Sequence, residues 1–188
     1  MTLVLTLVAH GPTAATRQAA FPGDDPLLPG SGPGPLPWRG RRVLASPARA
    51  CQETAAALSL LAERDPALAE MDHGRWSGKP LAEVAAAEPE ALARWIADPD
   101  YQGHGGESRA ALALRVADWL ERIAAGGSHV LALTHASVIR ALVLRVLDAP
   151  AAAFWALDVG PATLTELRHD GRRWALRALA CPLPAHRR

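Results

Sequence analysis

The sequence predicts an α/β fold: a three-layer αβα sandwich around a mostly parallel sheet, with an antiparallel edge strand and a small helical cap insertion. Short apolar runs alternate with segments of helical periodicity, a pattern typical of parallel sheets. Near the end of the chain, Thr163–Leu167 and Trp174–Arg177 alternate around Asp170-Gly171, which predicts a closing hairpin. These two observations together give the fold class.

Size and composition favour one globular domain. The chain has 188 residues and a formal net charge of +1, so we expect a single domain over 1–188, with the cap-like insertion at about 71–106. The near-neutral charge gives no reason to expect nucleic-acid binding, and no apolar run reaches transmembrane length. No basic leader is visible, so we expect a cytoplasmic protein. The Ala- and Arg-rich composition is typical of a bacterial source.

The first half predicts two strand-to-helix units. Residues 2–8 are expected to form a buried strand and Pro12–Ala20 a short helix. The Pro- and Gly-rich stretch Phe21–Gly40 is expected to be a loop that either borders the site or crosses the surface. Residues 42–45 then predict a short strand. Ser46–Glu63 predicts a helix, with serine as N-cap and proline at the first helical position.

The second half continues the alternation. Pro66–Glu70 is interpreted as another strand, and residues 80–97 as a helix broken at Pro89. An amphipathic helix is expected at about 107–125, ending at Gly126-Gly127. The last predicted strand-to-helix unit comprises a strand at 129–134 and a helix at 136–147.

Polar residues with suitable chemistry stand at three predicted strand-to-helix junctions: His10, the Ser46–Arg49 corner and His135. Helix amino ends, two imidazoles and a guanidinium suit a phosphoryl group. One histidine after one strand is more often structural, but two such histidines and the corner favour function. We expect no metal and no cofactor. The histidines lack ligand spacing, and Cys51 and Cys181 are too few for a thiolate site or a disulfide framework.

Five segments, in order, resemble the histidine phosphatase superfamily, which includes phosphoglycerate mutase. Residues 8–13 resemble its Arg-His-Gly-Glu-Thr signature, and residues 46–55 its Ser-Pro-x-x-Arg-Ala-x-x-Thr-Ala motif. Residues 70–78 resemble Glu-x-x-x-Gly-x-Trp-x-Gly. Residues 105–108 match Gly-Gly-Glu-Ser, and residues 134–140 resemble the final motif, His-Gly-x-x-Ile-Arg. The motifs span nearly the whole chain, so the resemblance implies the family's fold.

The resemblance also implies a mechanism. His10 would attack phosphorus and carry a transient phosphohistidine, and Glu70 would act as acid and then base. His135 would complete the catalytic set by holding phosphoryl oxygens. The implied phosphate-binding residues are Arg49, Gly11 and Thr16. The implied substrate contacts are Glu107, Ser108 and Arg17, although Glu107 and Ser108 could instead cap the long helix. His73 and His104 are expected at the pocket rim or on the surface.

The chain departs from the first motif, and this leaves two functions open. Ala9 replaces the signature arginine, and Arg17, Arg39 or Arg109 could substitute for it. The leading hypothesis is a phosphomonoesterase acting on a small phosphorylated metabolite. A mutase is less favoured, because the insertion is short. The alternative is an impaired member that binds a phosphorylated or anionic ligand, or a protein partner, without turnover. A homodimer through a strand edge or the Trp95 helix also stays open.

Overall fold

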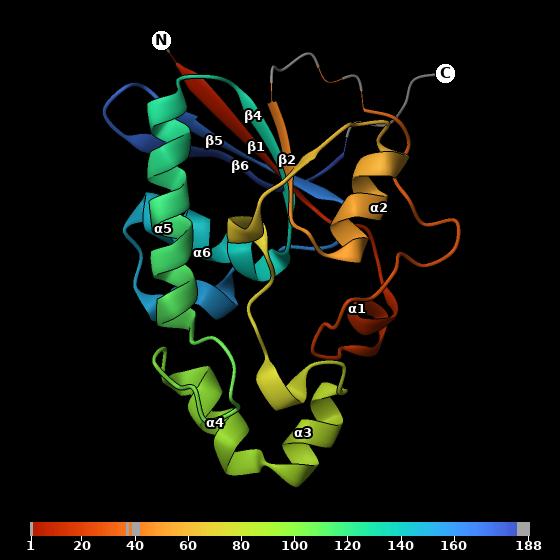
Figure 1. The fold of residues 1–188 in the computed structure, drawn as a ribbon. Helices are drawn as coiled ribbons and strands as arrows, with labels where there is room; N and C mark the ends of the chain where they lie inside the picture. The colour runs from red at the N-terminus through yellow and green to blue at the C-terminus, as the bar shows by residue number, and fades with distance from the viewer. Residues whose placement is uncertain (1, 37, 39–41, 184–188) are drawn as a thin grey trace.

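The computed structural model describes residues 2–36, 38 and 42–183. It shows a six-stranded sheet in the order β3-β2-β4-β1-β5-β6, with helices on both faces (Figure 1). The strands are β1 (Leu3–Ala9), β2 (Arg42–Ala45), β3 (Glu63–Arg64), β4 (Val130–Thr134), β5 (Thr163–His169) and β6 (Trp174–Pro182). β3, β2, β4 and β1 pair in parallel, whereas β5 and β6 form the antiparallel edge. The predicted fold class is confirmed.

Six α-helices and three 3-10 helices connect the strands in the described residues. The α-helices are α1 (Ala14–Gln18), α2 (Arg49–Ala57), α3 (Leu81–Ala87), α4 (Pro89–Ala97), α5 (Arg109–Gly126) and α6 (Ala136–Leu147). The 3-10 helices are η1 (Pro66–Leu68), η2 (Gly74–Trp76) and η3 (Ala151–Ala156). In the part of the chain that the structure describes, no helix is long and apolar enough to cross a membrane.

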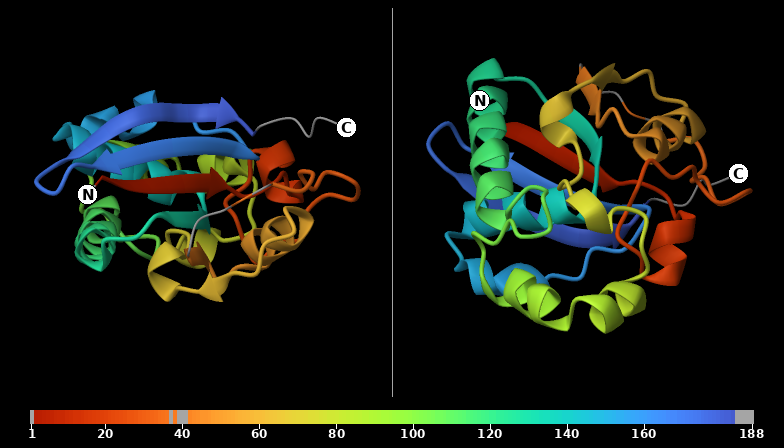
Figure 2. Two further views of the ribbon diagram at one scale, coloured as in Figure 1. Left: turned by 90° about the horizontal axis from the view of Figure 1, so that it is seen from above. Right: turned by 60° about the horizontal axis from the view of Figure 1, so that its bottom comes forward.

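The alternation of β1 explains why the sheet has two covered faces. Leu5 and Leu7 belong to a large buried cluster with residues of α5 and α6. Val8 points to the opposite face and belongs to a smaller cluster with Cys51 and Leu58, at α2. Figure 2 shows α5 and α6 on one side of the sheet and α2 on the other. A strand apolar on both faces therefore lies at the centre, as its continuous apolar run predicts.

The helix predicted over Ser46–Glu63 is wrong at both ends. The observed α2 has Ala48 as its N-cap, with no side-chain cap bond. Ser46 instead continues the line of β2, and its backbone N–H donates to the Leu133 carbonyl at 2.9 Å. Beyond the helix, Ser59 takes a left-handed φ of 59°, which turns the chain out of the helix. Sheet pairing thus overrides the helical pattern of the sequence.

The strand predicted over Pro66–Glu70 is also wrong. The short strand β3 precedes that segment and pairs with Leu44 and Ala45 of β2. The Asp65 side chain then accepts from the Ala67 N–H and caps η1, so Pro66 opens a 3-10 turn rather than a strand.

Other elements agree closely with the prediction. The strand at 42–45 and the helix at 136–147 are observed with the predicted bounds, and Pro89 begins α4 directly after α3. Gly127 caps α5 with a left-handed φ of 62°. The first helix is shorter than predicted, because Thr13 is its N-cap. Within the loop predicted over 21–40, residues 37 and 39–40 lie outside the described chain.

The segment from 71 to 106 lies below the carboxyl ends of β1 and β4 (Figure 1). It is tied to the first loop, because Phe21 N–H donates to the Lys79 carbonyl and Gly78 N–H donates to the Phe21 carbonyl, both at 2.9 Å. This position is where a cap over the sheet end would lie, and the division of the chain into core and cap stays a prediction.

Candidate active site

His10 and His135 lie together at the carboxyl ends of two paired strands. Ala9 of β1 is in register with Thr134 of β4, so the residues that follow them leave the sheet side by side. The His10 backbone N–H donates to the Thr134 carbonyl at 3.0 Å. The two imidazole centroids are 5.1 Å apart, in an edge-on arrangement. The sequence thus correctly placed two histidines at one sheet edge.

The ring nitrogens of His10 are distinct. Its Nδ1 lies 2.8 Å from the Gly11 carbonyl oxygen, which can only accept a hydrogen bond. Nδ1 must therefore carry the proton in the neutral ring, and Nε2 holds the free lone pair. Burial also lowers the pKa of His10, more than the Gly11 carbonyl and Asp25 raise it. The residue is a neutral imidazole with an available nucleophilic nitrogen.

Glu70 lies beside His135, on the segment between η1 and η2. One of its oxygens, Oε1, accepts from the Met71 N–H at 2.8 Å and from the Ser137 hydroxyl. The other, Oε2, lies 3.5 Å from Nδ1 of His135. Burial raises the pKa of Glu70 to about 7. Near neutral pH the carboxyl group can therefore both give and take a proton, and Oε2 is the oxygen free to do so.

His135 is buried, with 4% of its side chain exposed, and caps the sheet end of α6. Its Nε2 lies 2.8 Å from the Ser46 hydroxyl and 3.6 Å from the Cys51 sulfur. Its Nδ1 makes no hydrogen bond within the described chain. Burial, followed by the charge of His10, holds the pKa of His135 well below its usual value. The ring is thus neutral, with Nε2 held by Ser46 and Nδ1 directed toward Glu70.

Cys51 and Ser137 are site residues that sequence reasoning missed, and Ser46, part of the predicted corner, has a different role from the one expected. Ser46 was expected to cap a helix, but its hydroxyl bonds His135 instead. Burial raises the pKa of Cys51, so the thiol next to His135 stays neutral. Ser137 lies within the final motif, two residues after His135, and its position in the first turn of α6 was the available signal.

Gly11 and Thr16, both predicted phosphate ligands, already have partners within the chain. The Gly11 N–H donates to the Thr54 hydroxyl at 2.9 Å. The Thr16 hydroxyl accepts from the Thr13 N–H at 2.9 Å and forms a capping box with Thr13. These residues shape the turn after His10, and a phosphate would have to compete for their donors.

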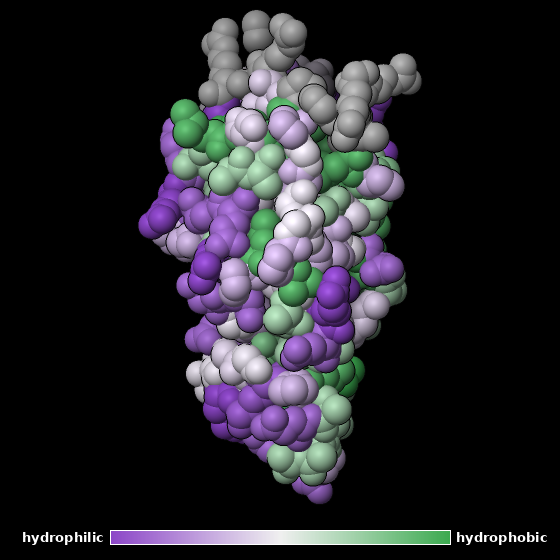
Figure 3. All heavy atoms as spheres, turned by 90° about the vertical axis from the view of Figure 1, so that its right-hand side faces the viewer, coloured by the Kyte–Doolittle hydropathy of each residue, from purple (hydrophilic) through white to green (hydrophobic). Residues whose placement is uncertain are grey.

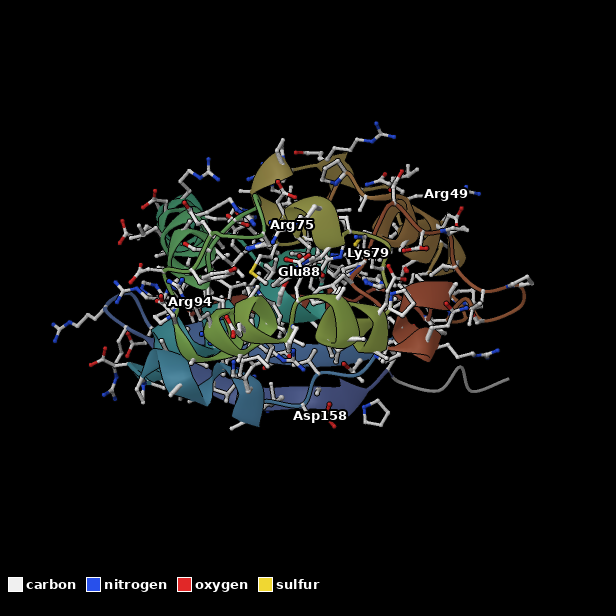
Figure 4. All side chains as sticks on the ribbon, turned by 90° about the horizontal axis from the view of Figure 1, so that it is seen from below. Arg49, Arg75, Lys79, Glu88, Arg94 and Asp158 are labelled. Carbon is white, nitrogen blue, oxygen red and sulfur yellow. The ribbon has the colours of Figure 1, made fainter. Side chains whose placement is uncertain are left out.

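Arg49 is not brought to the two imidazoles. Its Nε donates to Glu53 at 2.7 Å, and 57% of its side chain is exposed. Figure 4 shows Arg49 at the outer rim of the face seen from below. The motif that residues 46–55 resemble has two residues between proline and arginine, whereas this chain has only Ala48. One residue rotates a helical side chain by roughly 100°, so Arg49 faces outward and Ala50 occupies the inward position.

Two of the three predicted substrate contacts have partners within the chain. Glu107 pairs with Arg115 through both carboxylate oxygens, at 2.9 and 2.7 Å. The Ser108 hydroxyl accepts from the Ala111 N–H at 3.1 Å and caps α5. Arg17 lies exposed in the last turn of α1. The capping alternative raised from the sequence is therefore observed for Ser108, while Glu107 buttresses the long helix.

The other candidate arginines and histidines lie away from the two imidazoles or outside the described residues, except His73 near the aromatic cluster. Arg109 donates to the Ile96 carbonyl at 2.9 Å and is buried, and Arg39 lies outside the described residues. His73 and His104 are buried rather than on the surface, because they pack against aromatic rings. Among the described residues, no group of three or more His, Cys, Asp or Glu side chains could hold a metal ion.

Comparison with known proteins gives a consistent result. Residues 37–182 match the family described as histidine phosphatase superfamily (branch 1). A bifunctional protein of Mycobacterium tuberculosis is 32% identical over 185 residues, covering 89% of this chain and 51% of the relative. The chain thus spans about half the length of the first curated relatives it matches.

Two further similarities concern phosphatases. Phosphoserine phosphatase 1 of Hydrogenobacter thermophilus is 30% identical over 124 residues, covering 64% of this chain and 59% of that protein. The solved structure of a mycobacterial glucosyl-3-phosphoglycerate phosphatase, complexed with VO3, is 25% identical with a TM-score of 0.79. That alignment covers 95% of this chain and 99% of the other.

Proposed function

The chain belongs to the histidine phosphatase superfamily, and we propose that it is a phosphomonoesterase that hydrolyses a small phosphorylated metabolite through a phosphohistidine on His10. The observation that carries this proposal is the protonation pattern at the sheet edge. Nδ1 of His10 is held by the Gly11 carbonyl, which leaves Nε2 with its lone pair, and the His10 ring lies 5.1 Å from the His135 ring. Glu70 has a pKa of about 7, and its Oε2 lies 3.5 Å from Nδ1 of His135, which makes no hydrogen bond to the described residues. These groups match the nucleophile, the acid and the oxygen ligand that the proposed reaction needs.

In the first step, Nε2 of His10 attacks phosphorus, and the bond from phosphorus to the ester oxygen breaks. Glu70 gives its proton to that oxygen, so the alcohol leaves neutral. In the second step, the Glu70 carboxylate takes a proton from water, whose oxygen attacks phosphorus. The N–P bond then breaks, and phosphate and free His10 are released. One hard displacement becomes two easier ones.

The phosphoryl oxygens need donors. We assign Nδ1 of His135 to one of them, together with the amino end of α6, where backbone N–H groups and the helix dipole favour anions. A phosphate dianion bound here would have few positively charged side chains near it, because Arg49 faces outward and Ala9 is apolar.

That shortage supports the second candidate function, which is binding of a phosphorylated or anionic ligand without turnover. Losing a charge-assisted pair from a transition state costs roughly 2–5 kcal/mol. The sites of both candidate functions are the same, so the experiment must separate binding from chemistry.

Trapping of the covalent intermediate makes that separation. With p-nitrophenyl phosphate and rapid quenching, wild type should show a base-stable, acid-labile phosphoenzyme, and His10→Ala should show none. Glu70→Gln should accumulate it, because this leaving group needs little protonation while water attack still needs the base. Phosphate binding to wild type without phosphoenzyme or product, or equal turnover by His10→Ala, would overturn the proposal.

A further inference from the structure

A cavity of about 460 Å³ opens directly beside Glu70. One wall carries Glu70, Ser137 and Arg140, at the end of the sheet and the start of α6. A second wall is aromatic and comes from elements far apart in the sequence. It consists of Phe21, His73, Trp95, Phe154 and Trp155. The volume lies within the range of small-molecule sites.

The aromatic wall is continuous. Ring centroids are 5.0 Å apart for Phe21 and His73, 5.4 Å for Phe21 and Trp95, and 4.9 Å for Trp95 and Trp155. Phe154 extends it, 4.9 Å from Trp155. Such distances are those of attractive ring pairs, so the first loop, α4 and η3 present one surface to the cavity.

The wall is also held in place. The Trp155 indole N–H donates to the Ile96 carbonyl at 3.1 Å, and the Arg109 guanidinium donates to the same oxygen at 2.9 Å. That guanidinium lies 5.1 Å from the Trp155 ring centroid. Trp155 nevertheless keeps 38% of its surface exposed. A fixed, exposed indole beside a carboxyl acid provides a preformed face on which a planar ring can stack.

Charge is scarce around the cavity. Among the described residues that line it, only Glu70 and Arg140 are ionisable as an acid or a strong base. Arg140 is constrained, since its Nε donates to the Leu157 carbonyl at 2.8 Å. An alcohol rich in charges would find few partners here. An aromatic alcohol would displace water chiefly from the exposed Trp155 indole, which the other four rings, each at most 7% exposed, support from behind.

We propose that this cavity holds the leaving alcohol and selects phosphomonoesters whose alcohol carries a planar aromatic ring. The inference rests on the proposed function, because it places the ester oxygen at Glu70 and the rest of the alcohol in the cavity. It adds a substrate class to the reaction.

The test compares alcohols of similar acidity, so that leaving-group reactivity does not decide the outcome. Wild type should hydrolyse 2-phenylethyl phosphate with about tenfold higher kcat/KM than n-butyl phosphate. 2-Cyclohexylethyl phosphate, equally bulky but not planar, should fall near the butyl ester. Trp155→Ala should bring the phenyl-to-butyl ratio near one, and Trp155→Phe should retain most of it. Trp174→Ala, in β6 outside the cavity, should leave it unchanged.

A binding measurement keeps the inference separate from catalysis. The non-hydrolysable 3-phenylpropylphosphonate should bind wild type about tenfold more tightly than pentylphosphonate, monitored by tryptophan fluorescence or calorimetry. Equal kcat/KM for all three esters overturns the inference and leaves the phosphatase function standing. A cyclohexyl ester as fast as the phenyl ester overturns the aromatic claim. No turnover of any ester, with the phosphonate preference intact, overturns the proposed function and supports the cavity's selectivity.

Discussion

At the scale of single residues, Arg49 and Ala50 occupy adjacent positions in the first turn of α2 but face different surroundings. Arg49 is exposed and paired with Glu53. The carbonyl of the buried Ala50 accepts from the Thr54 hydroxyl, which in turn accepts from the N–H of Gly11, next to His10. The sequence pattern identified an arginine at this corner, but whether it points inward depends on helix phase. This chain has one residue fewer between the proline and the arginine than the motif has, and this offset changes the side of the helix on which the arginine lies.

Placing a guanidinium at position 50, which faces inward, should therefore increase kcat/KM. Ala50→Arg should raise kcat/KM for a phosphomonoester about tenfold or more, because a charge-assisted hydrogen bond to a phosphoryl oxygen contributes about 1.5–3 kcal/mol. Steady-state kinetics with p-nitrophenyl phosphate measures the effect, and thermal unfolding checks that the variant folds.

The matched control is Arg49→Ala, which should change kcat/KM less than about twofold, since it removes only an exposed ion pair. If Arg49→Ala instead abolishes activity, Arg49 must leave Glu53 and enter the site when substrate binds, as the sequence predicts.

Among the helices and strands, the sequence predicted those ends that depend on local residues better than those that depend on tertiary contacts. Pro89 divides α3 from α4, and Gly127 ends α5, because each acts through its own backbone. At the ends of the predicted helix the contacts are tertiary. Glu63 begins β3, the Ser46 N–H donates to the Leu133 carbonyl, and the Ser46 hydroxyl bonds His135. Pairing with β2 and with an imidazole 89 residues away leaves no trace in local periodicity.

The positions of the two histidines were predictable from a local signal combined with a rule of sheet topology. Each follows an apolar run, and parallel strands end at one edge, so topology brings His10 and His135 together. The aromatic wall was not predictable, since it joins the first loop to α4 and η3 across the fold.

The capping role of Ser108 in α5 leads to a prediction about stability. Ser108→Ala should lower the free energy of unfolding by about 1 kcal/mol, because the Ala111 N–H loses its acceptor in a part-buried position. Urea denaturation measures this, and kcat/KM should be unchanged. Ser77→Ala, at an exposed serine, is the control. A fall in kcat/KM without loss of stability would make Ser108 a substrate contact instead.

Across the whole molecule, the outer surface mixes polar and apolar residues, whereas the site contains buried titratable groups with shifted pKa values. The face seen in Figure 3 mixes hydrophilic and hydrophobic residues, and the described residues there form no single continuous apolar surface. Inside, burial lowers the pKa values of His10, His73 and His135 and raises the pKa of Glu70 to about 7. Stability should therefore depend on pH through these buried groups.

The sign follows from each shift. The pKa of His73 is lowered from 6.5 to about 4, so the unfolded chain binds more protons between these values, and stability is lost as pH falls from 6.5 to 4. His10 and His135 act in the same direction. Glu70 opposes them: its pKa is raised from 4.5 to about 7, so its contribution is full below pH 4.5 and lost as pH rises to 7. Three histidines outweigh one carboxyl group between pH 4.5 and 6.5.

The free energy of unfolding should consequently rise from pH 5 to pH 6.5, and His73→Phe should flatten this rise. Each proton of difference contributes about 1.4 kcal/mol per pH unit, so the variant should lose roughly that slope while its phenyl ring keeps the contacts with Phe21 and Trp95. Urea denaturation across this interval gives both slopes. His169→Phe, at a partly exposed histidine, controls for the added ring. Parallel slopes for wild type and His73→Phe would show that His73 is protonated equally in both states, and that its burial does not make folding depend on pH.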